Sequence, residues 1–213
     1  MNVRTIGKLV SDKKYVAVVG SGLSVNRMTN EEFREIKEVA YVIMVNYAFC
    51  RFGKEEMDML VWYDLAVTDW IEANVKDGVS LWTNMAAFRG RQYSPLKSRV
   101  DFWLEGGLGQ YTLSMALANL CKFLPSKKVL LFGVDLKVKK GDDENVKWYD
   151  SHIDFDKEKR GCVYPSQRAF DGFERDLRLF VRRGNIVNCN ADSALELYPR
   201  MNWREVTRGD CDE

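Results

Sequence analysis

Short runs of apolar residues recur along the chain, and within each run apolar residues follow one another instead of alternating with polar ones. Such runs predict strands that are covered on both faces, as in a parallel sheet. The predicted strands are Tyr15–Val19, Tyr41–Val45, Met59–Tyr63, Val79–Trp82, Val129–Phe132 and Asn185–Val187.

The segments between these runs carry apolar residues at the spacing of one helix face. The predicted helices are Glu31–Glu38, Ala66–Val75, Gly109–Phe123 and Ser166–Arg183. Because strands and helices alternate, the sequence predicts an α/β fold, a Rossmann-like and mostly parallel sheet with helices on both faces. The chain shows no internal repeat and no Pro/Gly-rich linker, so we expect residues 1–213 to form a single domain. The polar tail from Trp203 onward is expected to be frayed.

One segment departs from this alternation. Residues 137–160 read KVKKGDDENVKWYDSHIDFDKEKR, which is too charged to be buried and longer than an ordinary connection. The segment is either a solvated excursion or a lid over the carboxyl edge of the sheet. Trp148, Tyr149 and His152 within it favour the lid.

The composition excludes several classes of protein. Lysine plus arginine (32) nearly balances aspartate plus glutamate (31), so no overall field attracts the chain to nucleic acid or to a membrane surface. With no secretory signal and no apolar run of membrane-spanning length, we expect a cytoplasmic protein. Five scattered cysteines without CxxC spacing argue against a disulfide framework, and a single histidine excludes a multi-histidine metal site.

A local basic segment, FRGRQYSPLKSR, is the one candidate for contact with a phosphodiester backbone or an acidic substrate. Its cations are interleaved with aromatic residues, a composition found in nucleic-acid-binding segments. A solvated loop is the commoner explanation of such a segment. The basic residues are Arg89, Arg91, Lys97 and Arg99.

Short polar or small residues follow nearly every predicted strand. In open parallel sheets, ligands bind outside the carboxyl ends of the strands, so these residues would line one crevice. They are Gly20–Ser24, Asn46, Asp64, Thr83, Asn84, Gly133–Asp135 and Asn188–Asn190. Asn and Asp also favour turns, so each of them alone has a structural explanation. Their recurrence along the whole edge predicts a binding crevice.

Two turns are rich in small residues. Gly20-Ser21-Gly22-Leu23-Ser24 follows the first predicted strand, and Glu105–Gly109 (EGGLG) directly precedes the residues YTLSMALANLCKF of a predicted helix. Backbone N–H groups without a neighbouring Cβ can approach a phosphate closely, and a helix N-terminus favours an anion. Each turn could equally be a tight packing site between a helix and a strand. The first turn lacks both the third glycine of the dinucleotide fingerprint and the Gly-Lys-Ser/Thr of a P-loop.

The order of these motifs resembles that of the single-domain bacterial sialyltransferases that use CMP-activated sugars. It also resembles a related group of Rossmann-like proteins that includes the archaeal 6-hydroxymethylpterin pyrophosphokinases. The resemblance is carried by GSGLS, VNYAF, WYDL, LEGGLGQYTLSMALANL, VLLFGVDL and SALELYP.

The resemblance implies that the glycine-rich turns and the residues after the strands hold a nucleotide and its phosphate. Together with the pattern at the strand ends, it gives as nucleotide-binding residues Gly20, Ser21, Gly22, Ser24, Asn46, Asp64, Asn84, Gly106, Gly107 and Gly133. It further implies a histidine base for the acceptor hydroxyl, tyrosine hydroxyls that steady the departing phosphate, and no required cofactor or metal.

The chain departs from this family in its histidine. The family's histidine lies shortly before the helix that follows the lid, where this chain reads GCVYPSQRAF. His152 would serve as the base only if the lid folds it inward, and it could instead be an exposed loop histidine. Carboxylates are the substitutes for the base, and tyrosines could donate to the leaving phosphate. The candidate catalytic residues are His152, Asp135, Tyr149 and Tyr164, with Asp150 and Asp154 as further bases.

Three hypotheses about function follow. The first is a glycosyltransferase that moves a sugar from a nucleotide-activated donor, with the CMP type favoured, to the hydroxyl of a glycan, a metabolite or a modified nucleobase. The second is a pyrophosphokinase-like enzyme in which Asp64, Asp69 and Asp135 hold Mg²⁺, and the carboxylate of Asp64, where the sialyltransferases usually have asparagine, favours it. The third is a non-catalytic nucleotide-binding module, which the missing histidine favours.

Overall fold

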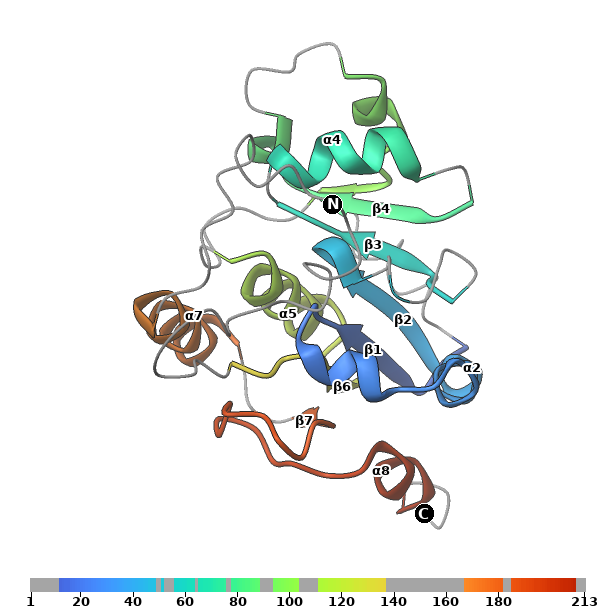
Figure 1. Cartoon of the computed structure of the whole chain (residues 1–213), viewed down its shortest axis with the longest axis vertical. Coiled ribbons are helices and arrows are strands. Elements are labelled where there is room, and N and C mark those ends of the chain that lie inside the picture. The colour runs from blue at the N-terminus through green and yellow to red at the C-terminus, as the bar shows by residue number, and fades with distance from the viewer. Residues whose placement is uncertain are drawn as a thin grey trace.

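The strands of the protein form one parallel sheet. The computed structural model describes residues 12–48, 51, 56–63, 65–75, 78–88, 94–103, 111–136, 167–181 and 185–209. Its strands are β1 (Tyr15–Val19), β2 (Ala40–Val45), β3 (Met59–Val61), β4 (Ser80–Thr83), β5 (Phe102–Trp103), β6 (Lys128–Phe132) and β7 (Ile186–Asn188) (Figure 1). They lie in the order β5-β4-β3-β2-β1-β6-β7, and every pairing between them is parallel.

Helices cover both faces of this sheet, as the sequence predicts. The α-helices are α2 (Asn30–Val39), α4 (Leu65–Asn74), α5 (Thr112–Phe123), α7 (Gln167–Phe180) and α8 (Trp203–Gly209). The 3₁₀ turns η1 (Leu23–Arg27), η2 (Asn46–Ala48) and η3 (Met85–Phe88) follow β1, β2 and β4, and a further one, η4 (Pro95–Arg99), precedes β5. Helices α2, α4 and α8 cover one face and α5 and α7 cover the other (Figure 1). Side chains of each group belong to the core on their own face. The α/β, Rossmann-like fold is therefore confirmed.

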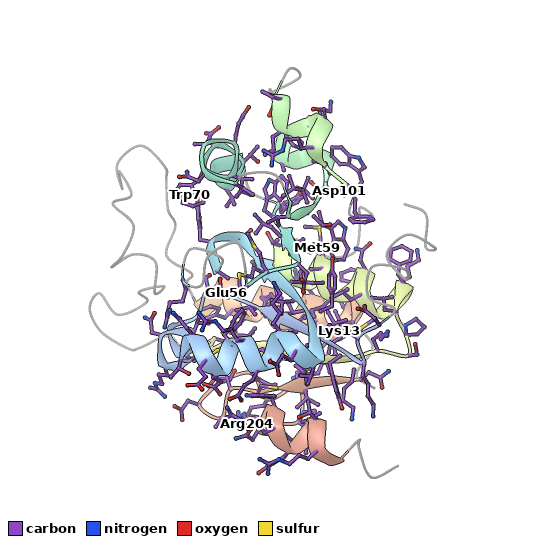
Figure 2. All side chains as sticks on the ribbon, turned by 90° about the vertical axis from the view of Figure 1, so that its right-hand side faces the viewer. Lys13, Glu56, Met59, Trp70, Asp101 and Arg204 are labelled. Carbon is purple, nitrogen blue, oxygen red and sulfur yellow. The ribbon has the colours of Figure 1, made fainter. Side chains whose placement is uncertain are left out.

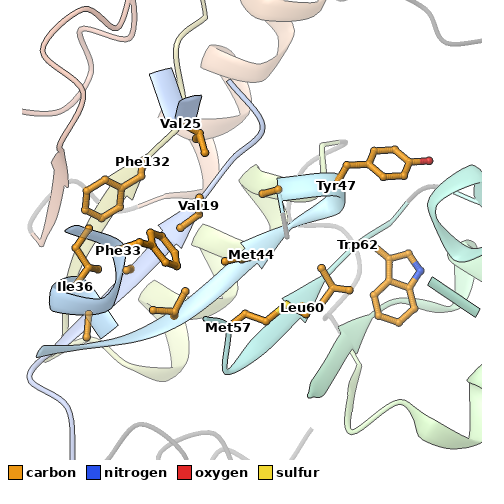
Figure 3. Packing of buried hydrophobic residues seen from close by; sticks show 14 of the residues in the cluster. Val19, Val25, Phe33, Ile36, Met44, Tyr47, Met57, Leu60, Trp62 and Phe132 are labelled. Carbon is orange, nitrogen blue, oxygen red and sulfur yellow. The ribbon is translucent and has the colours of Figure 1, made fainter. Parts of the chain in front are cut away.

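The continuous apolar runs reflect burial on both faces. In β1, Val19 faces the core beneath α2, whereas Val18 faces the core beneath α5 and α7, and both are fully buried. Figure 3 shows Phe33 of α2 between Val19 and Phe132, the last residues of two neighbouring strands. Burying a large apolar side chain contributes about 1.5–3 kcal/mol, so each strand stabilises both layers of the fold.

The first strand lies in the interior of the sheet. From β1 the chain proceeds outward through β2, β3, β4 and β5, and it then crosses back to place β6 on the other side of β1. Val19 is in register with Met44 of β2 and with Phe132 of β6. This reversal of strand order between β1 and β6 is a topological switch point, where the loops after the two strands diverge and a crevice commonly forms.

Two elements differ from the sequence-based expectations. Strand β5, at the edge of the sheet, was not predicted, because two residues are too few to show a pattern. The expectation that the tail from Trp203 is frayed was wrong for residues 203–209, which form α8. Trp203 and Val206 are buried, and Figure 2 shows Arg204 on this helix, where its guanidinium donates to Glu35 of α2 at 2.6 Å. The other residues of this segment are mostly polar, so the sequence does not show that Trp203 and Val206 anchor it to the core.

Candidate functional site

The turns after β1 and β6 pack directly against each other at the switch point. The N–H of Gly20 donates to the carbonyl of Phe132, and the N–H of Gly22 donates to that of Gly133, both at 2.8 Å. A Cβ on Gly20 would lie 2.6 Å from the Gly133 oxygen, and one on Gly22 would lie 2.7 Å from it. Gly133 itself has a φ of +63°, a conformation that favours glycine. Close approach of two backbones thus requires the small residues here.

A carboxylate ties these turns together. Asp135 Oδ2 accepts from the backbone N–H of Ser24 at 2.8 Å, and Oδ1 accepts from the Ser24 hydroxyl at 2.5 Å. Asn190, from the loop after β7, donates its Nδ2 to Asp135 Oδ1, also at 2.5 Å. The turns that follow β1, β6 and β7 are therefore joined by one side chain, which we call the Asp135 clamp.

The clamp limits what the glycine-rich turn can offer to a ligand. The N–H groups of Gly20, Gly22 and Ser24 already donate within the protein, so a phosphate would have to displace those bonds to use them. The Asp135 carboxylate accepts three hydrogen bonds, and these contacts hold the turn in place. Ser21, between the two glycines, is partly exposed. Anion binding by this turn stays a prediction. The hydrogen bonds and close contacts of the turn support its role in packing against the turn after β6.

Asn46 presents a different kind of geometry. It directly follows β2 at the carboxyl edge and has a φ of +53°, which asparagine adopts more readily than other residues with a Cβ. Its side-chain Oδ1 is buried and has no hydrogen-bond partner within the described part of the chain. An unpaired buried acceptor costs about 1–3 kcal/mol. A donor supplied by a ligand would remove that cost.

Asn84, the polar residue after β4, is partly exposed. Its Nδ2 lies 3.8 Å from the sulfur of Met115 in α5, and its carbonyl accepts from the N–H of Ala87. These contacts fix the residue at the end of its strand. Its assignment to nucleotide binding stays a prediction.

A cavity of about 220 Å³ opens beside the switch point on the face covered by α2 and α8. Ser24 and Gly133, two of the predicted site residues, line it. Its wall also includes residues of η1, of α2, of the loop after β7 and of α8, among them Arg27, Glu32, Asp192 and Trp203. These segments are far apart in the sequence and meet at the carboxyl ends of β1, β6 and β7.

Each charged side chain among the described lining residues of the cavity has a partner within the protein. Arg27 forms an ion pair with Asp192 near solvent. Glu32 Oε1 accepts from the indole Nε1 of Trp203 at 3.2 Å and lies 3.5 Å from a guanidinium nitrogen of Arg204. Burial raises the pKa of the Cys189 thiol, which also lines the cavity, to about 12, so this thiol is neutral at physiological pH.

Several predicted residues lie outside the described residues. These are Asp64, Gly106, Gly107, Tyr149, Asp150, His152, Asp154, Tyr164, Arg89 and Arg91, together with the charged segment 137–160. Of the carboxylates proposed for Mg²⁺, Asp69 is exposed on α4 and Asp135 forms the clamp. In the basic segment, Arg99 Nη1 donates to the carbonyl of Val75 at 3.0 Å, a contact within the protein.

Part of this arrangement is not predicted by the sequence. The sequence places Asn190 among the polar residues after a strand, but it does not predict the hydrogen bond from Asn190 to Asp135. Arg27 and Asp192 are 165 positions apart, and no local pattern pairs them. Asn188 did carry a signal, because an asparagine side chain often accepts a hydrogen bond from the backbone N–H two residues later and so stabilises a turn. Here the N–H of Asn190 donates to Asn188 Oδ1 at 3.2 Å.

No helix within the described ranges is long and apolar enough to span a membrane. Over the same ranges, no group of three or more His, Cys, Asp or Glu side chains is arranged to hold a metal ion.

Comparison with known proteins yields a likeness of fold. No family model and no curated protein matches the chain. Among solved structures, the chain is similar to the MAf glycosyltransferase from Magnetospirillum magneticum AMB-1, with a TM-score of 0.51 and 14% sequence identity. The match covers 95% of this chain but only 37% of that protein. At this level of identity the likeness shows a shared fold.

Proposed function

We propose that this chain is the nucleotide-binding domain of a glycosyltransferase, with a CMP-activated sugar as its donor. The observation that carries the proposal is the buried, unpaired Oδ1 of Asn46 at the carboxyl end of β2. The resemblance to CMP-sugar-dependent sialyltransferases implies a nucleotide-holding asparagine at this position. The fold shared with a protein described as a glycosyltransferase adds support from a separate source.

In this proposal the described residues bind and position the donor. Asn46 Oδ1 accepts a hydrogen bond from a ribose hydroxyl or from the amino group of the base. The Asp135 clamp fixes the turn after β1, and the exposed edge of that turn, including Ser21, faces the donor. Gly20, Gly22 and Gly133 act by letting the two turns approach closely.

The reaction is a displacement at the anomeric carbon. The acceptor hydroxyl forms the new C–O bond while the bond between the sugar and the CMP phosphate breaks, and CMP leaves with the electron pair. The hydroxyl proton passes to a base. Because Asp135 is engaged in the clamp, we assign that base to His152, with Asp150 and Asp154 as the alternatives in the same charged segment.

The Asp135 clamp also weighs against the Mg²⁺-dependent alternative. Both carboxylate oxygens of Asp135 already accept hydrogen bonds. A Cβ on Gly22 would lie 2.8 Å from Asp135 Oδ2, so the backbone of the turn crowds this oxygen. A cation at Asp135 would have to displace Ser24 or Asn190, which favours the transferase over the pyrophosphokinase-like enzyme.

A thermal-shift screen tests the proposal. The protein is melted with CMP, CDP, UDP, GDP, ADP or ATP, each with EDTA and with Mg²⁺. A ligand at 100 times its Kd stabilises the folded state by about 2.7 kcal/mol, which raises the Tm of a chain of this size by roughly 5–11 °C. We expect this rise with CMP regardless of metal. A rise with ATP that requires Mg²⁺ would contradict the proposal, and so would the absence of a rise with every nucleotide. A rise with CMP and no turnover of any CMP-sugar would favour a non-catalytic nucleotide-binding module.

The variant Asn46→Gly tests whether CMP binds at Asn46. Glycine adopts a φ of +53° without strain and removes the unpaired acceptor, so the free protein should be as stable as the wild type or slightly more so. The rise in Tm with CMP should then disappear. Retention of the full CMP effect in Asn46→Gly would remove the observation on which the proposal rests. Release of CMP from a CMP-sugar in the presence of candidate acceptors then tests turnover.

A further inference from the structure

We propose that the cavity between η1, α2, α8 and the loop after β7 binds a neutral, polyhydroxylated ring of about the size of one monosaccharide. This inference deepens the proposed function, since it rests on that function for the role of the ring as part of a substrate. The position of the cavity is the first argument. It opens at the carboxyl ends of β1, β6 and β7, beside the switch point, which is where open α/β sheets bind their ligands.

The size of the cavity restricts the ligand. Pockets that enclose drug-sized ligands measure about 300–1,000 Å³, whereas this cavity measures about 220 Å³. A complete nucleotide-sugar is too large for it, and a single ring is not. The cavity therefore suits one part of a donor or a small acceptor.

The charges of the lining point to a neutral ligand. Arg27, the cation at the mouth, is already paired with Asp192. The carboxylate of Glu32 is held by the indole N–H of Trp203 and by Arg204 behind it. Among the described lining residues the two carboxylates thus outnumber the one cation, and this excess of negative charge would oppose an anion such as a phosphate.

The same groups suit hydroxyls. Carboxylate oxygens accept several hydrogen bonds, so Glu32 and Asp192 can each accept from a ligand hydroxyl without losing their partners. The Ser24 hydroxyl, which donates to Asp135, keeps lone pairs that can accept from the ligand. Trp203 adds apolar surface to the wall, as an aromatic side chain with a polar tip commonly does at binding sites. The oxygen acceptors of the cavity can bind the hydroxyl groups of a sugar-like ring, and the apolar surface of Trp203 can pack against its C–H groups.

The indole N–H of Trp203 gives a direct readout. In ¹H–¹⁵N NMR spectra of the full chain, its resonance is assigned as the one that disappears in Trp203→Phe. We expect it to move in a saturable way with millimolar galactose, glucose, N-acetylglucosamine or cytidine, because the ligand shares Glu32 with it. The indole of Trp62 is the internal control. Trp62 directly follows β3, which β2 and β1 separate from β6, and its indole donates to Thr68 inside the core, so its resonance should stay fixed.

Ala191→Phe is the variant that tests the location. Ala191 is exposed and lines the cavity, so a larger side chain can occupy the space without disturbing the core. We expect an unchanged Tm and at least a tenfold weaker response of the Trp203 resonance. An undiminished response in Ala191→Phe, or a stronger response to inorganic phosphate than to any neutral ring, would overturn the proposal.

The probes also separate the two sources of such a ring. A response to saccharides assigns the cavity to an acceptor sugar, and a response to cytidine alone assigns it to the ribose of the donor. If CMP stabilises the protein but no neutral ring shifts the Trp203 resonance, this inference is wrong and the proposed function is retained. If a saccharide shifts the Trp203 resonance but no nucleotide stabilises the protein, the cavity binds a sugar and the proposed function is wrong.

Discussion

Asp135 accepts two hydrogen bonds from Ser24, a residue 111 positions earlier in the chain. One comes from the backbone N–H and the other from the hydroxyl, so the carboxylate fixes both the path of the turn after β1 and the orientation of its serine. The contact joins the two strands that flank the switch point. A single side chain thereby fixes the turn at the edge where we place substrate binding.

Replacing Asp135 by asparagine should therefore lower stability. An amide has one acceptor oxygen, and its NH₂ group would face at least one of the donors from Ser24 or Asn190. We expect the free energy of unfolding, measured by urea denaturation, to fall by about 1–3 kcal/mol.

Asp192→Asn, which removes an exposed ion pair, is the control and should cost at most about 1 kcal/mol. If turnover is established, Asp135→Asn should leave the shape of the pH profile of kcat unchanged. Wild-type stability in Asp135→Asn, together with a lost pH dependence, would instead identify Asp135 as the base.

Gly22→Ala tests the close approach of the two turns. The new Cβ would lie 2.6 Å from Asp135 Cγ and 2.7 Å from the carbonyl oxygen of Gly133, distances at which the backbone must move. We expect a loss of about 1–3 kcal/mol in urea denaturation. Gly209→Ala is the control, because a Cβ there meets no atom within 4 Å. Equal stability of the two variants would show that the turns can separate without cost.

Cys189 should make stability depend on alkaline pH. Burial raises its pKa from 9.0 to about 12, so between these values the unfolded chain loses a proton that the folded chain keeps. The contribution is complete below pH 9, and it falls by about 1.4 kcal/mol per pH unit until the folded thiol ionises. Burial, with Asp58 nearby, also raises the pKa of Tyr41, which acts in the same direction.

The variant Cys189→Ala isolates the thiol from Tyr41. Urea denaturation at pH 8, 9, 10 and 11 should show a steeper decline above pH 9 for the wild type than for the variant. Parallel pH profiles of the two proteins would mean that the thiol is not shielded from solvent.

Thr68→Val should disrupt a buried hydrogen-bond relay at the start of α4. Thr68 Oγ1 accepts from the indole of Trp62 and donates to the carbonyl of Ala87, each at 2.9 Å. Valine keeps the shape but leaves both partners without this hydroxyl, at a cost of about 2–3 kcal/mol. Thr68→Ser retains the hydroxyl and should recover most of the stability. An equal loss in the two variants would assign the effect to packing instead.

Much of the fold could be predicted because its causes are local. The run YVAVV predicts a strand buried on both faces, and β1 has that burial. Phe102–Trp103 joins the sheet only through its pairing with β4, so its own sequence gave no sign of a strand. Helix α8 escaped prediction for a similar reason, since Trp203 and Val206 matter only because α2 and the sheet lie opposite them.

The candidate site could be predicted less completely. The sequence placed Gly20, Gly22 and Gly133 at the carboxyl edge, and the structure confirms that position while giving the glycines a packing explanation. The clamp depends on a contact between residues 24 and 135, and the cavity on contacts between η1, α2, α8 and the loop after β7. Contacts between such distant segments depend on the order of the strands in the sheet, and that order cannot be read from local patterns in one sequence.

The position of β1 in the sheet has a consequence for synthesis of the protein. Tyr15 pairs with Lys128 of β6, so one side of the first strand stays without its partner until 113 further residues have been translated. At about 5–20 residues per second, that interval lasts roughly 6–23 seconds. During it the nascent chain carries an apolar strand with an open edge, the kind of surface on which chains aggregate and chaperones act. The turn after β1 can be clamped only when β6 and Asp135 arrive, so the edge assigned to substrate binding is among the last parts of the molecule to mature.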